Sequence, residues 1–465
     1  MNYKTPGVYV EEITKFPPSV AQVETAIPAF IGYTEKGPKN EPTRITSLLE
    51  YEALFGKAKN ETFSLTIEDS AIAVNGTMSS FKMYYAMQMY FANGGGPCYI
   101  VSANTFTSSG ANNSVVNNTV RINELNAGLA TLKKEDEPTL IVFPDAETLS
   151  IADACAVYGN ALDQAEMMKD RFVIMDVSGN SFSSVTDFRS ELGPGTSGKR
   201  LKYGAAYYPK LETILSYSFE DKDVAVTSLK EKNTDGDLVP VSIPTGENNL
   251  VWLKNNRSAL YNMAKDAIES KRVVMAPSSS IAGVYAKVDN TSGVFKAPAN
   301  VGLNYVVAPT EKISPDDLDN LNVDATSGKS INAIRTFAGK GTMVWGARTL
   351  DGNSNEWRYV SVRRFFNMVE ESVKKATERF VFEANTANTW VKVQAMIENF
   401  LNEQWKDGAL AGSKPEEAYY VSVGLNKTMS AQDILEGRMI IEVGMAAVRP
   451  AEFIVIRFSH KLQEA

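Results

Sequence analysis

Short apolar runs alternate with helix-like segments from Ile27 to Met275, and this alternation restricts the fold more than any other feature of the chain. Short apolar runs separated by segments with helical periodicity are typical of buried parallel strands joined by helices. The runs lie at 27–33, 99–101, 140–143, 172–175, 203–208 and 273–275, and the helical segments lie at 46–55, 80–92, 150–169 and 256–270. The sequence therefore predicts an α/β layer with a largely parallel sheet.

Two stretches interrupt this alternation. Residues 60–77 hold short β-like runs with a turn signal at Asn75-Gly76, and residues 212–249 are charged and rich in turn residues around Asp235-Gly236. We interpret both as surface insertions, and the second could form a small β subdomain.

The last third of the chain has a different pattern. Residues 362–382 place apolar side chains on one helical face and charged side chains on the other. A second helix is expected at 389–406, and Ser430–Asp433 has the spacing of a capping box with Asp in place of Glu. With a strand at 439–448, these elements predict a C-terminal α+β domain.

Each end of the chain has a strand-like segment without an evident partner. Residues 5–13 alternate β-branched and aromatic side chains, and two prolines then interrupt any regular element. Residues 453–458 are apolar on both faces. Neither segment can stabilise itself, so each must pair with a distant part of its own chain or with a neighbouring chain.

The expected fold class is therefore α/β, or α+β over the whole chain, with an extended strand-like arm at each end. The expected parts are an N-terminal arm at 1–20, a central α/β domain at 21–335 with insertions at about 60–77 and 212–249, a C-terminal α+β domain at 336–450, and a C-terminal arm at 451–465.

Composition excludes several classes of function. The 465 residues carry 47 Lys and Arg against 55 Asp and Glu, a formal net charge of −8. A negative chain argues against general binding of nucleic acid or of an anionic membrane surface. No apolar run reaches the roughly 18 residues that span a bilayer, and the first residues do not have the pattern of a signal peptide. We therefore expect neither a nucleic-acid partner nor direct membrane insertion.

The rare residues restrict the chemistry further. Two cysteines and one histidine cannot build a four-ligand Cys/His zinc site. Cys98 and Cys155 lie in apolar surroundings and are interpreted as buried, while His460 lies too near the end of the chain to favour a catalytic triad. Gly94–Gly96 follow a helix and precede a strand, the reverse of a phosphate-binding loop, and are interpreted as a helix end and turn. Ser314–Asp317 is interpreted as a helix N-cap.

We therefore expect no catalytic residue, no cofactor and no metal ion in this chain. An α/β enzyme that oligomerises and lacks a recognisable active site is the alternative. Such an enzyme would need polar side chains that converge on one site, and the sequence contains no motif with that spacing.

Short motifs spread over nearly the whole chain, outside the two insertions, match one known family. They are Pro6–Glu12, Ile27–Pro38, Asn93–Ile100, Ala276–Ala286, Lys296–Asn300, Val344–Leu350, Glu356–Arg364, Gly408–Gly412 and Val443–Phe453. These motifs resemble contractile tail sheath proteins, which serve bacteriophages with contractile tails and phage-derived injection particles of bacteria. Type VI secretion sheaths are a less similar class, because they are divided between two polypeptides whereas this chain carries both ends.

The resemblance implies a structural subunit that polymerises as stacked hexameric rings around an inner tube. Such sheaths contract from an extended, metastable form and drive the tube through a target envelope. The implied partners are further copies of this chain, the inner tube protein, and baseplate and terminal cap proteins. The implied location is a virion tail or tail-like particle that is assembled in the bacterial cytoplasm.

The resemblance also implies residue roles. Sheath subunits exchange their terminal arms with neighbours, and the arm residues here would be Val8, Tyr9, Val10, Ile13, Phe453, Ile454, Val455, Ile456 and Phe458. Helices of the C-terminal domain contact the tube in this family. We therefore predict tube contacts at Arg363, Arg364, Lys374, Lys375 and Arg379, with Lys392 and Lys406 on the following helix as the second choice. The residues alone favour an ordinary solvated helix face with i, i+4 ion pairs such as Glu370–Lys374 and Glu371–Lys375.

Overall fold

The computed structural model describes residues 20–106, 118–179, 181–193 and 198–453. The chain forms two compact units. The small unit takes its described residues from Met1–Val23 and Met368–Val448, and the large unit takes them from Glu24–Asn367 and Arg449–Ala465. Helix α10, Val360–Thr377, runs from the large unit into the small one.

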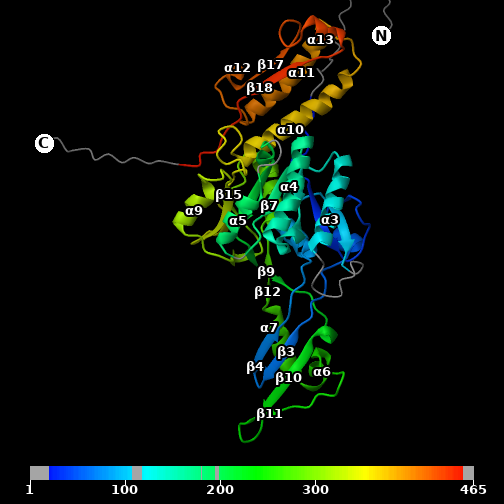
Figure 1. The fold of residues 1–465 in the computed structure, drawn as a ribbon, viewed down its shortest axis with the longest axis vertical. Helices are drawn as coiled ribbons and strands as arrows, with labels where there is room; N and C mark the ends of the chain where they lie inside the picture. Colours follow the sequence, from blue (N-terminus) through cyan, green and yellow to red (C-terminus); the bar gives the residue numbers. More distant parts are fainter. Residues whose placement is uncertain (1–19, 107–117, 180, 194–197, 454–465) are drawn as a thin grey trace, which may run out of the picture. The chain divides into compact units, whose positions relative to one another are not determined.

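A nine-stranded sheet forms the centre of the large unit (Figure 1). In spatial order its strands are β13 (Val301–Gly302), β16 (Gly341–Val344), β15 (Ile331–Phe337), β8 (Gly204–Tyr208), β7 (Phe172–Asp176), β6 (Leu140–Val142), β1 (Pro28–Thr34), β5 (Cys98–Thr105) and β2 (Thr43–Ile45). The run from β15 to β5 is parallel throughout, and β2, β16 and β13 add antiparallel strands at the edges. The predicted α/β layer with a largely parallel sheet is confirmed.

Helices cover both faces of this sheet, which explains why its central strands β1, β6, β7 and β8 are buried at every residue. Alternate strand residues face opposite layers: Ile31 and Val173 pack in one core, whereas Phe30 and Ile174 pack in the other. The first core is covered by α3 (Asn118–Thr131), α4 (Ile151–Met168), α5 (Ser183–Glu191) and α9 (Pro315–Asn322), and the second by α1 (Leu48–Phe55), α2 (Met83–Ala92) and α8 (Ser278–Ser292). Short 3-10 turns lie at η1 (Leu132–Lys134), η2 (Pro144–Thr148), η3 (Arg200–Tyr203) and η4 (Asp221–Asp223).

The apolar run at 273–275 does form a strand, β12 (Arg272–Met275), but not in the large sheet. It pairs antiparallel with β9 (Leu211–Ser216), and β9 pairs on its other side with β14 (Val306–Pro309). The prediction that this run continues the parallel alternation is therefore wrong. An apolar run specifies burial, but it does not specify which sheet supplies the partner.

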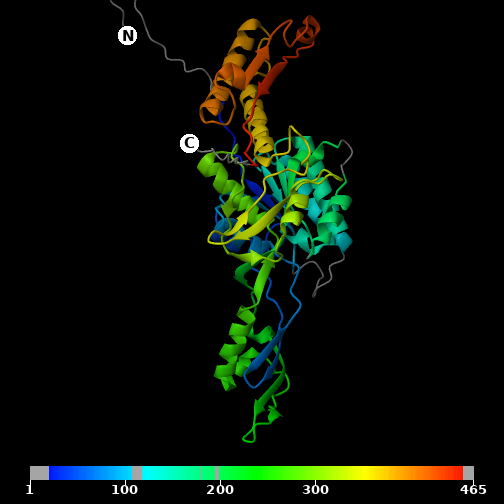
Figure 2. The ribbon, with the colours of Figure 1, turned by 90° about the vertical axis from the view of Figure 1, so that its left-hand side faces the viewer.

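The two insertions meet in one subdomain of the large unit. Strand β10 (Ala225–Lys232) pairs in parallel with β3 (Ser64–Glu68), although the two lie far apart in the sequence. The complete sheet has the order β11 (Leu238–Pro240), β10, β3, β4 (Ala71–Asn75), and α6 (Leu250–Asn256) and α7 (Ser258–Glu269) pack on it. Figures 1 and 2 show this subdomain projecting beyond β9 and β12.

The β subdomain expected in residues 212–249 also includes strands from residues 60–77, and the turn between β3 and β4 is not at Asn75-Gly76. Strands β3 and β4 pair with Glu68 opposite Ala71, so the turn lies at Asp69 and Ser70. Asp69 has a positive φ of 55°, a conformation that aspartate tolerates in tight turns. Asp69-Ser70 and Asn75-Gly76 both have turn propensity, and the register of β3 and β4 places the turn at Asp69-Ser70.

The small unit has the α+β composition that the sequence predicts. It contains the end of α10, η5 (Glu378–Phe380), α11 (Ala387–Lys406), α12 (Pro415–Ala418), β17 (Tyr419–Val423), α13 (Ala431–Leu435) and β18 (Ile441–Met445). The capping box is confirmed, because the Ser430 hydroxyl accepts from the Asp433 amide and the Asp433 carboxylate accepts from the Ser430 amide. Strands β17 and β18 pair antiparallel.

The expected boundary between central and C-terminal domains at residues 335 and 336 differs from the division in the structure. Strand β16 and the start of α10 belong to the large unit, and the division falls between Asn367 and Met368. The reason is that β15 and β16 form an antiparallel hairpin that extends the large sheet, so residues 336–367 are tied to the central layer.

Several local interpretations are confirmed. Cys98 and Cys155 are buried free thiols. Helix α2 ends at Asn93, and Gly94 follows in a left-handed turn with a φ of 99°. The Ser314 hydroxyl caps α9 by accepting from the amide of Asp317.

Gly32 in β1 has a packing requirement that the motif around it did not reveal. A Cβ at this position would lie 2.5 Å from Oδ2 of Asp145 and 2.9 Å from Cε of Met83. Asp145 is buried, and its two carboxylate oxygens accept hydrogen bonds from the amides of Tyr33 and Lys82, at 2.7 and 2.5 Å. The carboxylate therefore joins β1 to the start of α2, and only glycine leaves room for it.

We expect Gly32→Ala to lower the free energy of unfolding by about 1–3 kcal/mol, because the methyl group must displace a buried, hydrogen-bonded carboxylate. Denaturant unfolding of the purified subunit measures this loss. Gly96→Ala is the matched control, since a Cβ there meets no atom within 4 Å. A Gly32→Ala protein as stable as the Gly96→Ala protein would contradict the assignment.

Candidate functional site

Proteins with open α/β sheets usually bind ligands at the carboxyl edge of the parallel strands, so a catalytic or binding site would be expected there. Three acidic side chains lie there buried: Asp145 and Glu147 after β6, and Asp176 at the end of β7. Asp176 accepts a hydrogen bond of 2.8 Å from the amide of Ser278, at the start of α8. Burial raises the pKa of Asp145 to about 6 and that of Asp176 to about 7, and it also raises the pKa of Glu147.

Two of these carboxyl groups, those of Asp145 and Asp176, accept hydrogen bonds from backbone amides of other elements. Both oxygens of Asp145 are occupied by backbone amides, so that group is not available to a substrate proton. Asp176 ties β7 to α8. Within the described ranges, no three His, Cys, Asp or Glu side chains come close enough together to bind a metal ion.

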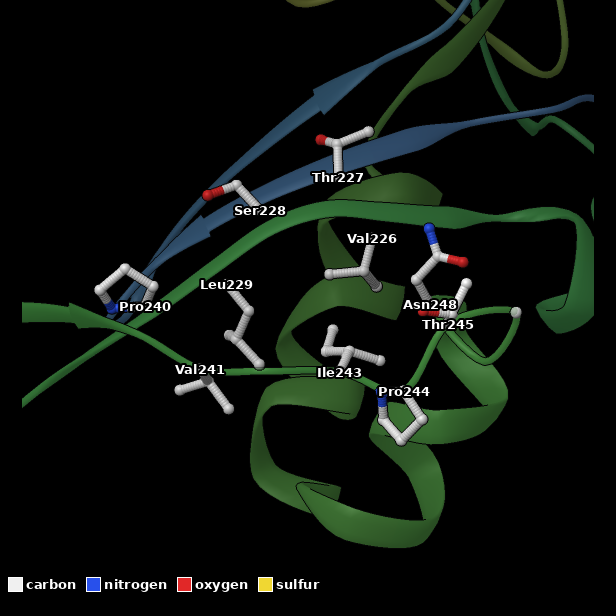
Figure 3. Close-up of a pocket in the computed structure, with 11 residues that line it drawn as sticks. Val226, Thr227, Ser228, Leu229, Pro240, Val241, Ile243, Pro244, Thr245 and Asn248 are labelled. Carbon is white, nitrogen blue, oxygen red and sulfur yellow. The ribbon is translucent and has the colours of Figure 1, made fainter.

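A groove of about 420 Å³ lies in the inserted subdomain, away from the sheet edge (Figure 3). Val226 and Leu229 of β10 point toward the loop at 240–248, and Thr227 points away from it. The lining residues are Val226, Thr227, Ser228, Leu229, Pro240, Val241, Ile243, Pro244, Thr245, Gly246 and Asn248. None of them carries an acidic or basic side chain, so the hydroxyl groups of Thr227, Ser228 and Thr245 have no general base in this lining to activate them.

The structure corrects two of the predicted tube-contact residues. Arg363 and Arg364 were expected on an exposed polar helix face, but they are 2% and 4% exposed. The Arg363 guanidinium lies 4.3 Å from the ring centre of Trp357 and donates to Asn367 at 2.8 Å. Arg364 forms an ion pair of 2.5 Å with Asp289. Because α10 begins inside the large unit, its first turns are enclosed on both faces.

The remaining basic residues of the prediction are accessible. Lys374 and Lys375 lie on α10, where their ammonium groups are 3.1 and 3.6 Å from carboxylate oxygens of Glu371. The sequence pairing of Glu371 with Lys375 is confirmed. Arg379 is exposed next to Phe380, and Lys392 and Lys406 are exposed on α11. The small unit thus carries basic groups along both of its long helices.

The predicted arm residues lie almost wholly outside the described part of the chain. Val8, Tyr9, Val10 and Ile13 precede it, and Ile454, Val455, Ile456 and Phe458 follow it. Phe453 is described, lies in no strand, and is 72% exposed. A large aromatic side chain this exposed at the start of an apolar segment is consistent with a partner that covers it.

Sequence reasoning missed a set of exposed apolar side chains on the small unit. Phe382 is fully exposed and has a positive φ of 70°, which is rare for a bulky residue. The set is Val381, Phe382, Val391, Tyr420, Leu425, Leu435 and Ile440. A break in the 3.6-residue period after Phe380 was the available signal for the first two. Val391 lies off the buried face of α11, and the other four lie in short elements or between them.

Sequence reasoning also missed Glu452 and its partners. The Glu452 carboxylate accepts hydrogen bonds from Arg348, Asn322 and Tyr359, which come from three separate segments of the large unit. Glu452 belonged to a matched motif, but one sequence gives no sign of which distant side chains it meets.

Comparison with known proteins shows what this architecture belongs to. A family model for the phage tail sheath C-terminal domain matches residues 353–461. The tail sheath protein of Vibrio phage KVP40 is 26% identical over 141 residues, which are 30% of this chain and 21% of the phage protein.

Solved structures match over the whole chain. A chain in the helical sheath of the anti-feeding prophage in its contracted state is 31% identical, with a TM-score of 0.64 and coverage of 99% of this chain and 100% of the other. A chain in the anti-feeding prophage baseplate is 32% identical, with a TM-score of 0.65 and the same coverage. A chain in the contracted sheath of the extracellular contractile injection system PVC is 28% identical, with a TM-score of 0.64 and coverage of 100% and 99%.

The chain belongs to the contractile tail sheath proteins. It is the subunit of a contractile sheath, a helical polymer in a phage tail or a tail-like injection particle. The matched chains lie in sheath polymers and in baseplate complexes, which supports self-assembly and association with a baseplate.

Among the described residues of this sheath protein, no helix is both long enough and apolar enough to cross a membrane. The α/β layer of the large unit, with its braced carboxyl edge, is part of this sheath subunit. Its buried acids have consequences for stability that do not depend on assembly.

Asp176 should make the stability of the subunit depend on pH. Its folded pKa of about 7 lies above the ordinary value of 3.8, so the folded state holds more protons than the unfolded state between these values. Its contribution to the unfolding free energy is therefore full below about pH 4 and is lost as the pH rises through 7. Asp176→Asn removes the charge, so the stability difference between variant and wild type should grow in favour of the variant from pH 5 to pH 8.

Denaturant unfolding at each pH measures this difference, at up to about 1.4 kcal/mol per pH unit for one group. Asp235→Asn, at an exposed turn, is the matched control and should give the same difference at every pH. A flat difference for Asp176→Asn would show that this carboxyl group is charged in the folded protein throughout the range.

Proposed function

We propose that copies of this subunit stack as rings around an inner tube and are linked by exchange of their terminal arms. Contraction of the resulting mesh then drives the tube through a target envelope. The observation that carries this proposal is the β17–β18 ribbon of the small unit, together with a strand-like segment at each end of the chain.

The ribbon supports arm exchange because an unpaired strand edge presents backbone groups that a further strand can pair with. Within the described part of the chain, β17 pairs with β18 and neither pairs with a third strand. Tyr420 on β17 is 54% exposed and Ile440 beside β18 is 41% exposed. Apolar strand segments from neighbouring subunits would supply backbone partners to the open edges and cover these side chains.

The exposed apolar side chains of the small unit support contact with further protein. Singly exposed apolar residues are ordinary, but Val381 and Phe382 are adjacent and both are exposed. Their partners in an assembled particle would be neighbouring subunits, the inner tube protein, and baseplate or terminal cap proteins. Assembly would take place in the bacterial cytoplasm, where these components are made together.

The subunit would do this work by assembly and not by catalysis. Its sheet-edge acids brace secondary structure, and the groove in the inserted subdomain is lined without ionisable groups. An oligomeric α/β enzyme is the less favoured alternative, because it needs a convergent polar site at one of these two places.

Deleting residues 1–15 should leave a folded subunit, since the helices and strands that the structure describes in both units all lie after these residues. It should abolish sheaths that contract as one body, because each ring loses a strand shared with its neighbour. Electron microscopy of assembled particles and thermal unfolding of the subunit measure the two outcomes.

Deleting residues 1–4 is the matched control, because it keeps the strand-like segment at 5–13. Particles with the longer deletion that contract along their full length would overturn arm exchange at this end of the chain.

The basic helices are proposed to contact the inner tube. Each contact would be a weak, exposed ion pair of about 0.2–1 kcal/mol, and repetition along the sheath would supply the strength. Lys374 and Lys375 are the first choice, with Arg379 beside them and with Lys392 and Lys406 on α11 as the second choice.

Reversing charge with Lys374→Glu and Lys375→Glu should impair assembly of extended sheath on tubes and leave the subunit folded. The loss should lessen at high salt, because screening weakens the repulsion. Lys265→Glu with Lys271→Glu, on and after α7 of the inserted subdomain, makes the same charge change elsewhere and should assemble normally. Equal assembly by both variants at physiological salt would move the contact to Lys392 and Lys406.

A further inference from the structure

The side chain of Glu452 accepts several hydrogen bonds although its backbone lies outside any helix or strand. It lies next to the last described residue, in a stretch without helix or strand. Its carboxylate accepts from Nη2 and Nε of Arg348 at 2.6 and 2.9 Å, from Nδ2 of Asn322 at 2.7 Å, and from the Tyr359 hydroxyl at 3.2 Å. A carboxylate that accepts from both Nε and Nη2 of one arginine forms the strongest kind of side-chain pair.

Arg348 is fixed to the central sheet. Its side chain is 4% exposed, and Nη1 donates to the carbonyl oxygens of Asn322 and Gly352 at 3.2 and 3.4 Å. Its backbone amide and carbonyl both bond to the side chain of Asn332, at 2.7 and 2.8 Å. Asn332 is a residue of β15, so an unbroken series of hydrogen bonds joins Glu452 to the nine-stranded sheet.

The charge of Glu452 persists at neutral pH. Burial by itself would raise the pKa of Glu452, but the hydrogen bonds from Arg348 and Asn322 outweigh burial and hold the pKa below its usual value. The next residue, Phe453, is 72% exposed. Glu452 is therefore the last side chain of the described chain that ties it to the large unit.

The segment between Glu452 and the preceding backbone hydrogen bond, that of Val448, is also short. The amide of Val448 donates to the carbonyl of Ala409 in the small unit, at 3.1 Å. Only three residues, Arg449–Ala451, separate Val448 from Glu452 along the chain. An anchor so close to the last backbone bond leaves little slack in this part of the chain.

We propose that Glu452, held by Arg348, Asn322 and Tyr359, is the anchor of the C-terminal arm. The anchor fixes the point at which the arm leaves its own subunit, so that the neighbouring subunit meets the arm in a confined volume. It also passes tension on the arm to the nine-stranded sheet. This inference rests on the proposed function, in which residues 453–458 pair with a neighbour.

The test is Glu452→Gln in the full-length subunit, with two readouts. Hydrogen exchange of the peptide around 449–453 should speed up about tenfold, the effect of losing one charged hydrogen-bond pair, while peptides of β1 and β7 keep their rates. Sheath assembled in the presence of the other particle components should fall by a similar factor. Glu137→Gln is the matched control, because Glu137 also pairs with an arginine and a tyrosine, Arg44 and Tyr99, but far from either end of the chain.

A milder variant keeps the proposal testable if Glu452→Gln lowers the yield of folded protein. Tyr359→Phe removes a single hydroxyl donor and should speed exchange and reduce assembly in the same direction by a smaller factor. A merely structural role would lower the melting temperature and leave assembly by the folded fraction unchanged, and that result would overturn the anchor.

Deletion of residues 454–465 separates this proposal from the one on which it rests. If the deletion abolishes assembly and Glu452→Gln does not alter it, arm exchange stands and the anchor is overturned. If the deletion leaves assembly intact, the proposed use of the C-terminal arm falls, whatever Glu452→Gln does. Equal loss of assembly in Glu452→Gln and Glu137→Gln would also overturn the anchor, since the effect would then be one of charge alone.

Discussion

The buried ion pair between Arg364 and Asp289 holds together elements that the chain order keeps far apart. Both side chains are 3% exposed, and the guanidinium bonds both carboxylate oxygens, at 3.0 and 2.5 Å. The hydroxyl of Thr25 donates to the same carboxylate, and its carbonyl accepts from Arg364. Removing one partner of such a pair leaves a buried charge, which typically costs about 3–5 kcal/mol. The start of the described chain, α8 and α10 therefore depend on one contact.

That contact also explains the orientation of the first turns of α10. The Arg364 guanidinium lies 4.6 Å from the ring centre of Tyr285, whose hydroxyl is 2.7 Å from that of Tyr207 in β8. Arg363 stacks on Trp357 in the same turn. Arginine suits such sites because its planar group can bond a carboxylate at its edge and stack on a ring with its face. Two residues that look like surface charges are thus part of the core.

The burial of Arg363 and Arg364 is a feature of the structure that the sequence pattern did not predict. Strands such as β1 and β7 and helices such as α4 and α11 followed from local periodicity, because burial on a sheet face or a helix stripe repeats at short range. Long-range pairing did not follow: β10 beside β3, and β12 beside β9, depend on contacts between segments far apart in sequence. Periodicity also assigns a charged residue to the solvent face by default, and so it misplaced Arg363 and Arg364. The apolar character of residues 453–458 was visible, but the Glu452 contacts before them were not.

Glu452 and Thr25 give the two ends of the described chain a common construction. Thr25 bonds Arg364 and Glu452 bonds Arg348, and each arginine is almost fully buried in the large unit. In a polymer that pulls on chain ends, each end needs an attachment that a change of side-chain rotamer alone does not break. Burial supplies this resistance, because a guanidinium that leaves its site loses several charge-assisted hydrogen bonds at once. An exposed lysine such as Lys374 replaces a weak ion pair by hydrogen bonds to water when it leaves its partner. Strong buried pairs at the chain ends and weak exposed pairs on the helices of the small unit therefore suit a subunit that must keep its own chain fixed while it changes partners.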